Sequence, residues 1–132
     1  SKEITLVSDN DKNKIDIQRS AEMIYGLRNF IGNAIKFSKS KVNIFLMSND
    51  KEIKIIVNDD GPGFPKDIID KLGEPYIKSR SFELNSNSGL GLGTFLGKTL
   101  LERQNAKLLF KDDKNLGGAS VVISWSPKNI LL

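Results

Sequence analysis

Short β-prone runs come mostly in pairs separated by turn residues, and this spacing constrains the fold more than any other feature of the sequence. Runs rich in β-branched residues and bounded by Asn, Asp, Ser and Gly are typical of hairpin strands. The predicted pairs are Glu3 to Val7 with Lys14 to Gln18, Lys41 to Met47 with Glu52 to Val57, and Lys107 to Lys111 with Ala119 to Trp125.

Three helices are predicted between these strands. Ser20 can cap the first, which runs to about Phe37; Pro65 to Leu72 and Thr94 to Arg103 form the others, with Asn105 ending the last. Hairpins therefore outnumber crossovers. This order favours an α+β fold: a two-layer α/β sandwich with a mixed, mostly antiparallel sheet and about three helices on one face.

The composition excludes several kinds of chemistry. A length of 132 residues fits one domain, and we expect residues 1–132 to form it. The sequence has no Cys and no His, which excludes thiolate zinc sites, Cys nucleophiles and histidine acid–base catalysis. The net charge of +4 comes from scattered lysines, so we expect no nucleic-acid partner. No apolar run approaches the ~20 residues that span a bilayer, and we expect a cytoplasmic domain.

Polar residues on the first predicted helix form one candidate site. Its apolar positions Ile24, Leu27, Ile31, Ala34 and Ile35 predict one buried stripe. Asn29, Asn33 and Lys36 lie roughly 120–180° from Ile24 around the helix. Amide oxygens are hard ligands suited to Mg²⁺, and a lysine one turn away would face phosphates. The alternative is a solvated polar face.

Two glycine-rich segments form the other candidates. Asp59 and Asp60 end a predicted strand and precede Gly61-Pro62-Gly63, where a carboxylate could accept a hydrogen bond from the exocyclic amine of adenine. An ordinary turn is the alternative. Ser88 to Thr94 carries three alternate glycines at a helix start, which is typical of an anion site, although a hinge would also need glycines. Residues 74–88, with Lys78 and Arg80, are predicted to form a lid or binding loop, or else a disordered insertion.

In this order, the segments resemble the ATP-binding catalytic domain of sensor histidine kinases, the Bergerat-type nucleotide fold. Leu27 to Phe37 resembles the N box, and Asp60 to Gly63 the G1 box. Gly73 to Tyr76 resembles the F-box region, and Gly89 to Gly93 the G2 box. The resemblance covers residues 15–126. Within the family, the sequences around Asn29 and Lys98 to Arg103 are most similar to RegB-type kinases, although Gly32 and Gly93 depart from the expected residues.

The resemblance implies roles for individual residues. Asn33 would hold Mg²⁺, Asn29 and Lys36 would act catalytically at the phosphates, and Asp60 would recognise adenine, so that Asp60→Asn should abolish most ATP binding. The remaining implied nucleotide contacts are Phe37, Gly61, Gly63, Tyr76, Lys78, Arg80, Gly89, Leu90, Gly91, Leu92, Gly93 and Thr94.

Asn29 bears on the reaction that the resemblance implies. DNA gyrase is similar but has a Glu at this point to activate water, and an amide cannot act as that base. The resemblance therefore implies transfer of the ATP γ-phosphoryl group to a histidine on a separate dimerisation domain, within a homodimeric, membrane-bound parent that signals to a response regulator. An anti-sigma-factor-type serine kinase or ATP-dependent binding regulator is the alternative.

Overall fold

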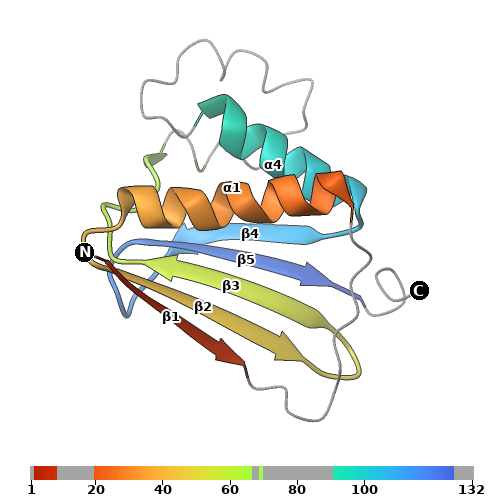
Figure 1. Cartoon of the computed structure of the whole chain (residues 1–132), viewed down its shortest axis with the longest axis horizontal. Helices are drawn as coiled ribbons and strands as arrows, with labels where there is room; N and C mark the ends of the chain where they lie inside the picture. The colour runs from red at the N-terminus through yellow and green to blue at the C-terminus, as the bar shows by residue number, and fades with distance from the viewer. Residues whose placement is uncertain (1, 9–19, 67–68, 70–90, 127–132) are drawn as a thin grey trace.

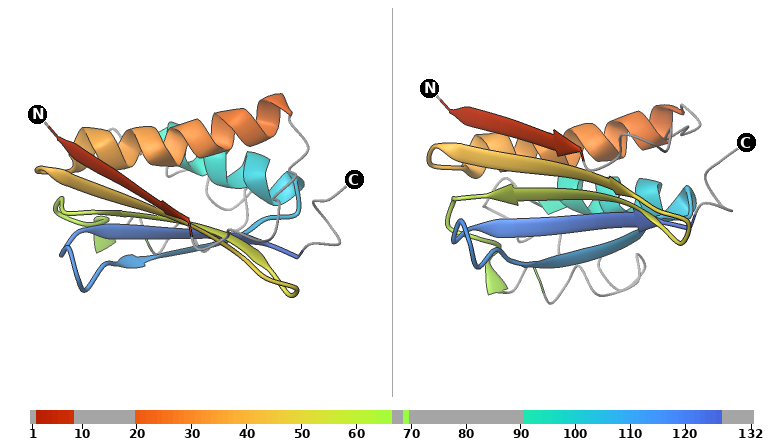
Figure 2. Two further views of the ribbon diagram at one scale, coloured as in Figure 1. Left: turned by 60° about the horizontal axis from the view of Figure 1, so that its bottom comes forward. Right: turned by 90° about the horizontal axis from the view of Figure 1, so that it is seen from below.

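The computed structural model describes residues 2–8, 20–66, 69 and 91–126. These residues form two layers, a five-stranded sheet and a layer of two long helices on one of its faces (Figures 1 and 2). The elements in chain order are β1 (Glu3–Ser8), α1 (Ala21–Phe37), β2 (Lys41–Ser48), β3 (Ile53–Asp59), α4 (Gly91–Arg103), β4 (Lys107–Asp112) and β5 (Ala119–Trp125). The predicted α+β sandwich is confirmed.

The sheet has the strand order β1-β2-β3-β5-β4. Strand β1 pairs in parallel with β2, whereas the other three pairs are antiparallel. The sheet is therefore mixed and mostly antiparallel, as predicted. The hairpin expected between residues 3–7 and 14–18 is not tested on both sides, because residues 14–18 lie outside the described residues.

Strand β3 positions the site because its side chains alternate between the two faces of the sheet. Ile53, Ile55, Val57 and Asp59 are buried, whereas the residues between them are only partly buried. The buried set belongs to the face that packs against the core. The same alternation that buries the apolar residues therefore carries the carboxylate of Asp59 to the helix-covered face.

Helix α1 begins as the sequence predicts but is rotated relative to the predicted stripe. The Ser20 side chain accepts a hydrogen bond of 3.0 Å from the Met23 backbone N–H, which is a helix N-cap. The fully buried positions are Met23, Gly26, Phe30 and Ala34, and the predicted Leu27, Ile31 and Ile35 are only partly buried. Of the predicted stripe, Ala34 is therefore confirmed as buried, whereas the predicted centre at Ile24 was wrong by part of a turn, because α1 packs against α4 as well as against the sheet.

Helix α4 differs from the prediction at its start, and the predicted helix at 65–72 is described only in part. Helix α4 begins at Gly91, three residues before the predicted start at Thr94. It ends as expected next to Asn105, which has a positive φ of 70°. Most of the predicted helix at 65–72 lies outside the described residues, although the Ile69 N–H donates a 3.1 Å bond to the Pro65 carbonyl, as in a helical turn. The described residues thus contain two long helices, where about three helices were expected.

Candidate functional site

A cavity of about 150 Å³ opens between α1, the end of β3, the start of β5 and the segment 62–65. Its walls are mostly apolar, and its polar side chains come from Asn33 and Asp59. The apolar side chains that line it are Phe30, Ala34, Phe37, Val57, Pro62, Phe64, Pro65, Ala119 and Val121. A flat apolar ring with a few polar edge groups is the kind of ligand that such walls accept.

Asp59 is the charged group of this cavity and is only 5% exposed. Its Oδ1 accepts backbone N–H bonds from Gly61 at 2.8 Å and Ala119 at 3.2 Å. Burial raises the pKa of the Asp59 carboxyl above 3.8, and these two hydrogen bonds act against that rise. In the described part of the chain no hydrogen bond uses its second oxygen, which leaves an acceptor for a ligand.

Asp60, the carboxylate predicted to contact adenine, lies outside the cavity. Its oxygens accept backbone N–H bonds from Lys39, Ser40 and Lys41 at 2.8 to 3.2 Å. These bonds, together with one from the Ser40 hydroxyl at 3.0 Å, hold the pKa of Asp60 well below its ordinary value. The prediction that Asp60 contacts adenine was therefore wrong. Successive residues along an extended chain point to opposite faces of the sheet, so Asp60, which follows β3, points away from the cavity that Asp59 lines. Its carboxylate stabilises the connection between α1 and β2 by hydrogen bonds.

Gly118 permits the contact between the β5 start and Asp59. A Cβ at Gly118 would collide with the Asp59 backbone and carboxylate, and would lie 2.6 Å from the Gly61 nitrogen. A side chain here would push apart the two segments that donate to Asp59. Of the predicted glycines, Gly61 donates to Asp59 and Gly63 lines the cavity.

The two asparagines of α1 lie beneath α4 rather than on a solvated face. Asn33 lines the cavity, and its Nδ2 donates to the Thr94 hydroxyl at 2.9 Å and to Asn29 Oδ1 at 3.4 Å. The side chain of Asn29 faces two glycines of α4: a Cβ would lie 3.0 Å from it at Gly93 and 3.2 Å from it at Gly97. The absence of side chains at these glycines is what lets the helices approach closely.

Some of the remaining predicted residues belong to the described part of the chain, and the others do not. Lys36 is exposed and does not line the cavity; its ammonium group lies 5.2 Å from the ring centroid of Phe37, which does line it. Gly91 and Leu92 belong to the first turn of α4. The predicted contacts Tyr76, Lys78, Arg80, Gly89 and Leu90 lie outside the described residues.

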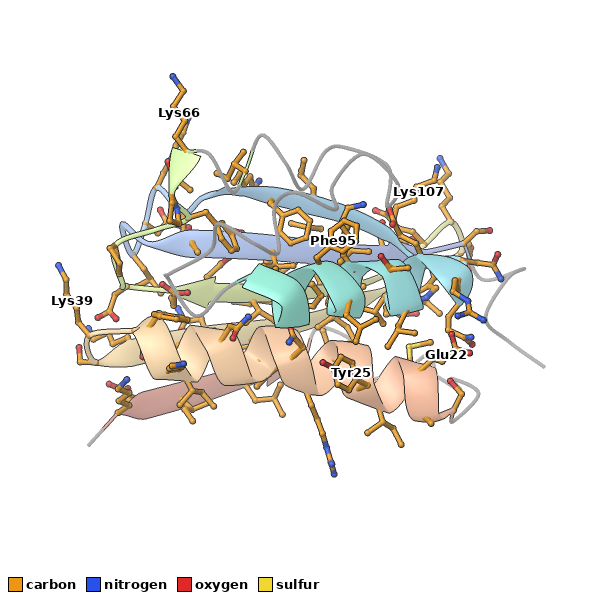
Figure 3. All side chains as sticks on the ribbon, turned by 90° about the horizontal axis from the view of Figure 1, so that it is seen from above. Glu22, Tyr25, Lys39, Lys66, Phe95 and Lys107 are labelled. Carbon is orange, nitrogen blue, oxygen red and sulfur yellow. The ribbon has the colours of Figure 1, made fainter. Side chains whose placement is uncertain are left out.

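Aromatic residues support the cavity in a way that the sequence analysis missed. Phe95 of α4 is 1% exposed and packs against Phe37, Phe64 and Phe110. Phe64 meets Phe110 of β4 edge to face, with ring centroids 5.6 Å apart. In Figure 3, Phe95 lies on the side of α4 that faces β4 and β5. No local sequence pattern connects these four residues, because each comes from a different part of the chain.

The comparisons with known proteins agree with this fold. Residues 19–129 match the model of the histidine kinase-, DNA gyrase B- and HSP90-like ATPase family. The sensor histidine kinase RegB of Cereibacter sphaeroides is 41% identical over 105 residues, which are 76% of this chain and 23% of that protein. CpxA of Escherichia coli K12 is 29% identical over 101 residues, 76% of this chain and 22% of that protein.

Solved structures of the same class share the fold. The catalytic domain of histidine kinase ThkA superposes with a TM-score of 0.71 at 18% identity, covering 93% of this chain and 78% of that one. The mycobacterial sensor histidine kinase MprB gives a TM-score of 0.67 at 18% identity, covering 94% of this chain and 80% of that one.

The chain therefore belongs to the histidine kinase-, DNA gyrase B- and HSP90-like ATPase family. Within that family, the relatives similar in sequence are sensor histidine kinases, which confirms the predicted class and its resemblance to RegB-type kinases. The comparisons do not favour the alternative of an anti-sigma-factor-type serine kinase. The chain spans less than a quarter of the length of these curated relatives. Within the described ranges, neither helix is both long and apolar enough to cross a membrane.

Proposed function

We propose that this chain binds ATP with the adenine ring in the cavity and the phosphates toward the amide face of α1 and the start of α4. The observation that carries this proposal is Asp59, a buried carboxylate among apolar and aromatic walls with one oxygen engaged by two backbone N–H groups. An ionised carboxylate only accepts hydrogen bonds. It therefore favours the exocyclic amine of adenine over the carbonyl that guanine carries at that position.

The donor set of α1 fits a magnesium ion beside the phosphates. Asn33 contributes a hard amide oxygen, which is the type of ligand that Mg²⁺ prefers, and its amide nitrogen is already engaged by Thr94. When bound, Mg²⁺ neutralises charge on the phosphates. Asn29 and Lys36 would complete the contacts to the phosphates, and Tyr76, Lys78, Arg80 and residues 89–93 would cover the nucleotide from the lid side.

We further propose that the bound ATP donates its γ-phosphoryl group to a protein histidine. Asn29 supports transfer over hydrolysis, because an amide cannot take a proton from water as a carboxylate base does. Catalysis then rests on positioning and on neutralising charge. The chain itself contains no histidine, so the acceptor must lie on another segment or another protein.

The proposed partners follow from this reaction. The acceptor histidine belongs to a dimerisation domain of the parent kinase, which is homodimeric, and a response regulator then takes the phosphoryl group. We propose that this chain is the cytoplasmic catalytic part of a membrane-anchored parent.

Transfer can be tested by mixing this chain with a histidine-bearing helical domain from the parent protein and γ-labelled ATP. We expect acid-labile label on the histidine-bearing domain. Asn33→Ala should abolish the transfer, whereas Asn115→Ala, in the exposed turn between β4 and β5, should leave it unchanged. ATP binding without any label transfer would contradict the kinase assignment.

A further inference from the structure

Thr94 joins the first turn of α4 to the proposed metal ligand on α1. Its side chain is a buried polar group in a mostly apolar layer, and the residue is only 1% exposed. Its hydroxyl oxygen lies 2.9 Å from Nδ2 of Asn33, a residue 61 positions earlier in the chain. A contact over that sequence distance fixes the position of one helix relative to the other.

The neighbours of Asn33 determine which end of its amide is available. Two oxygen acceptors, Thr94 Oγ1 and Asn29 Oδ1, converge on Nδ2 of Asn33, at 2.9 and 3.4 Å. The amide nitrogen therefore points to α4. Within the described ranges, no hydrogen bond occupies Oδ1 of Asn33, so the oxygen end is left for a cation.

A second threonine on the same helix shows that this contact is not required to satisfy a helical hydroxyl. Thr99 donates to the carbonyl of Phe95, one turn earlier in α4, at 3.0 Å. A threonine in a helix can satisfy its hydroxyl locally in this way. Thr94 in addition accepts a hydrogen bond from a side chain of the neighbouring helix, and that side chain belongs to Asn33, which lines the cavity.

Thr94 provides the one side-chain hydrogen bond between α1 and α4 in the described part of the chain. Near the opposite ends of the two helices, Arg103 Nε lies 3.4 Å from a carboxylate oxygen of Glu22. Between these contacts the helices meet through small residues, since the Asn29 side chain faces Gly93 and Gly97. Displacement of the first turn of α4 therefore acts on the Asn33 amide directly.

We propose that Thr94 is a positioning residue for the metal ion, and that its hydroxyl holds the Asn33 amide with the oxygen turned toward Mg²⁺. This inference rests on the proposed function of Asn33 as the magnesium ligand. The contact between Thr94 and Asn33 makes metal affinity depend on the position of the first turn of α4, although Thr94 does not itself bind the metal. Partners that orient a metal ligand in this way typically contribute about 10–100-fold to metal affinity.

The test compares Thr94→Val, Thr94→Ser and Thr99→Val. Binding of a fluorescent ATP analogue is measured in EDTA and across a Mg²⁺ titration. We expect Thr94→Val to weaken the Mg²⁺ dependence of binding, taken as the ratio of its own affinities in Mg²⁺ and in EDTA, by about tenfold. Thr94→Ser keeps the hydroxyl and should keep the Mg²⁺ dependence of the original chain. Thr99→Val is the matched control on the same helix.

A second measurement does not require any variant to fold. In the original chain without metal or nucleotide, the Asn33 side-chain NH₂ protons should exchange with solvent more slowly than those of Asn115, which is exposed. Equal exchange rates would overturn the inference, as would an unchanged Mg²⁺ dependence in Thr94→Val or an equal loss in Thr99→Val. Failure of the original chain to bind the analogue at all would instead contradict the proposed function.

Discussion

The backbone N–H of Ala119 donates a 3.2 Å hydrogen bond to the carboxylate of Asp59, a residue 60 positions earlier in the chain. Gly61 donates to the same oxygen at 2.8 Å. Two separate segments thus fix the rotation of one carboxyl group, and they leave its other oxygen for a ligand. Recognition of the base in the proposed complex depends on this fixed orientation.

Asp59→Asn should lower ATP affinity by about 10–100-fold, which corresponds to a charge-assisted hydrogen bond of roughly 1.5–3 kcal/mol. The backbone N–H groups of Gly61 and Ala119 will keep their hydrogen bonds to the oxygen of the new amide. The amide nitrogen will therefore face the exocyclic amine of adenine and repel it. Titration calorimetry measures the loss. Asp60→Asn is the control, and its ATP affinity should stay within about twofold of that of the original chain. A larger loss in Asp60→Asn than in Asp59→Asn would indicate that Asp60, and not Asp59, contacts the base.

The same two substitutions should change stability in opposite directions. Burial raises the pKa of Asp59 above 3.8, so the folded state binds the proton more tightly than the unfolded chain does. The contribution of this group to stability is therefore present below the ordinary pKa of 3.8 and is lost as the pH rises through the higher pKa of the folded state. Ionised Asp59 thus opposes folding at pH 7. We expect Asp59→Asn to raise the melting temperature at pH 7 in the absence of nucleotide.

Ionised Asp60 stabilises the folded state, in contrast to Asp59, because its hydrogen bonds hold its pKa below 3.8. Its contribution is fully present above the ordinary pKa and is lost as the pH falls through the lower value of the folded state. Asp60→Asn should therefore lower the melting temperature at pH 7. Thermal denaturation followed by circular dichroism, repeated at several pH values, checks both signs; equal shifts in the two variants would contradict the assignment of their environments.

Gly97→Ala should destabilise the contact between α1 and α4. The new methyl group would lie 3.2 Å from the Asn29 Cβ, which is fixed to the α1 backbone and cannot rotate away. Overpacking of this kind costs about 1–3 kcal/mol. Urea denaturation measures that cost, and nucleotide affinity in Mg²⁺ should fall with it because α4 carries Thr94 away from Asn33.

Gly32→Ala is the matched control for this substitution. Gly32 is exposed on α1, and nothing lies within 4 Å of its Cβ position. Replacing a helical glycine by alanine in open space stabilises by about 0.5–1 kcal/mol. A destabilised Gly32→Ala, or an unaffected Gly97→Ala, would contradict the account of the helix contact.

The sequence predicted the sheet and the long helices because their signals are local. The Ser20 cap and the strand runs of β2, β3, β4 and β5 all appear within a few neighbouring residues. The face of Asp59 was also available locally: alternation from Ile53 through Val57 places Asp59, and not Asp60, with the buried residues.

Other features of the site could not be read from local patterns. The rotation of α1 depends on α4, which buries Gly26 against Leu101 and covers Asn29. The Thr94–Asn33 contact and the packing of Phe95 against Phe64 join residues that only the folded chain brings together. Spacing along the helix identified the amides of Asn29 and Asn33, but it could not indicate which helix lies over them.

The hairpin turn before Ala119 has a consequence for how nucleotide affinity can diverge among related chains. The Asp113 side chain and backbone organise this turn through bonds to Leu116, Gly117 and Gly118. A change of its length, or of the Asp113 side chain that organises it, would move the Gly118–Ala119 segment and rotate the Asp59 carboxylate. Two proteins with identical residues around the base can therefore differ in affinity through a surface turn alone, and exchanging such turns between homologues would retune binding without altering any contact residue.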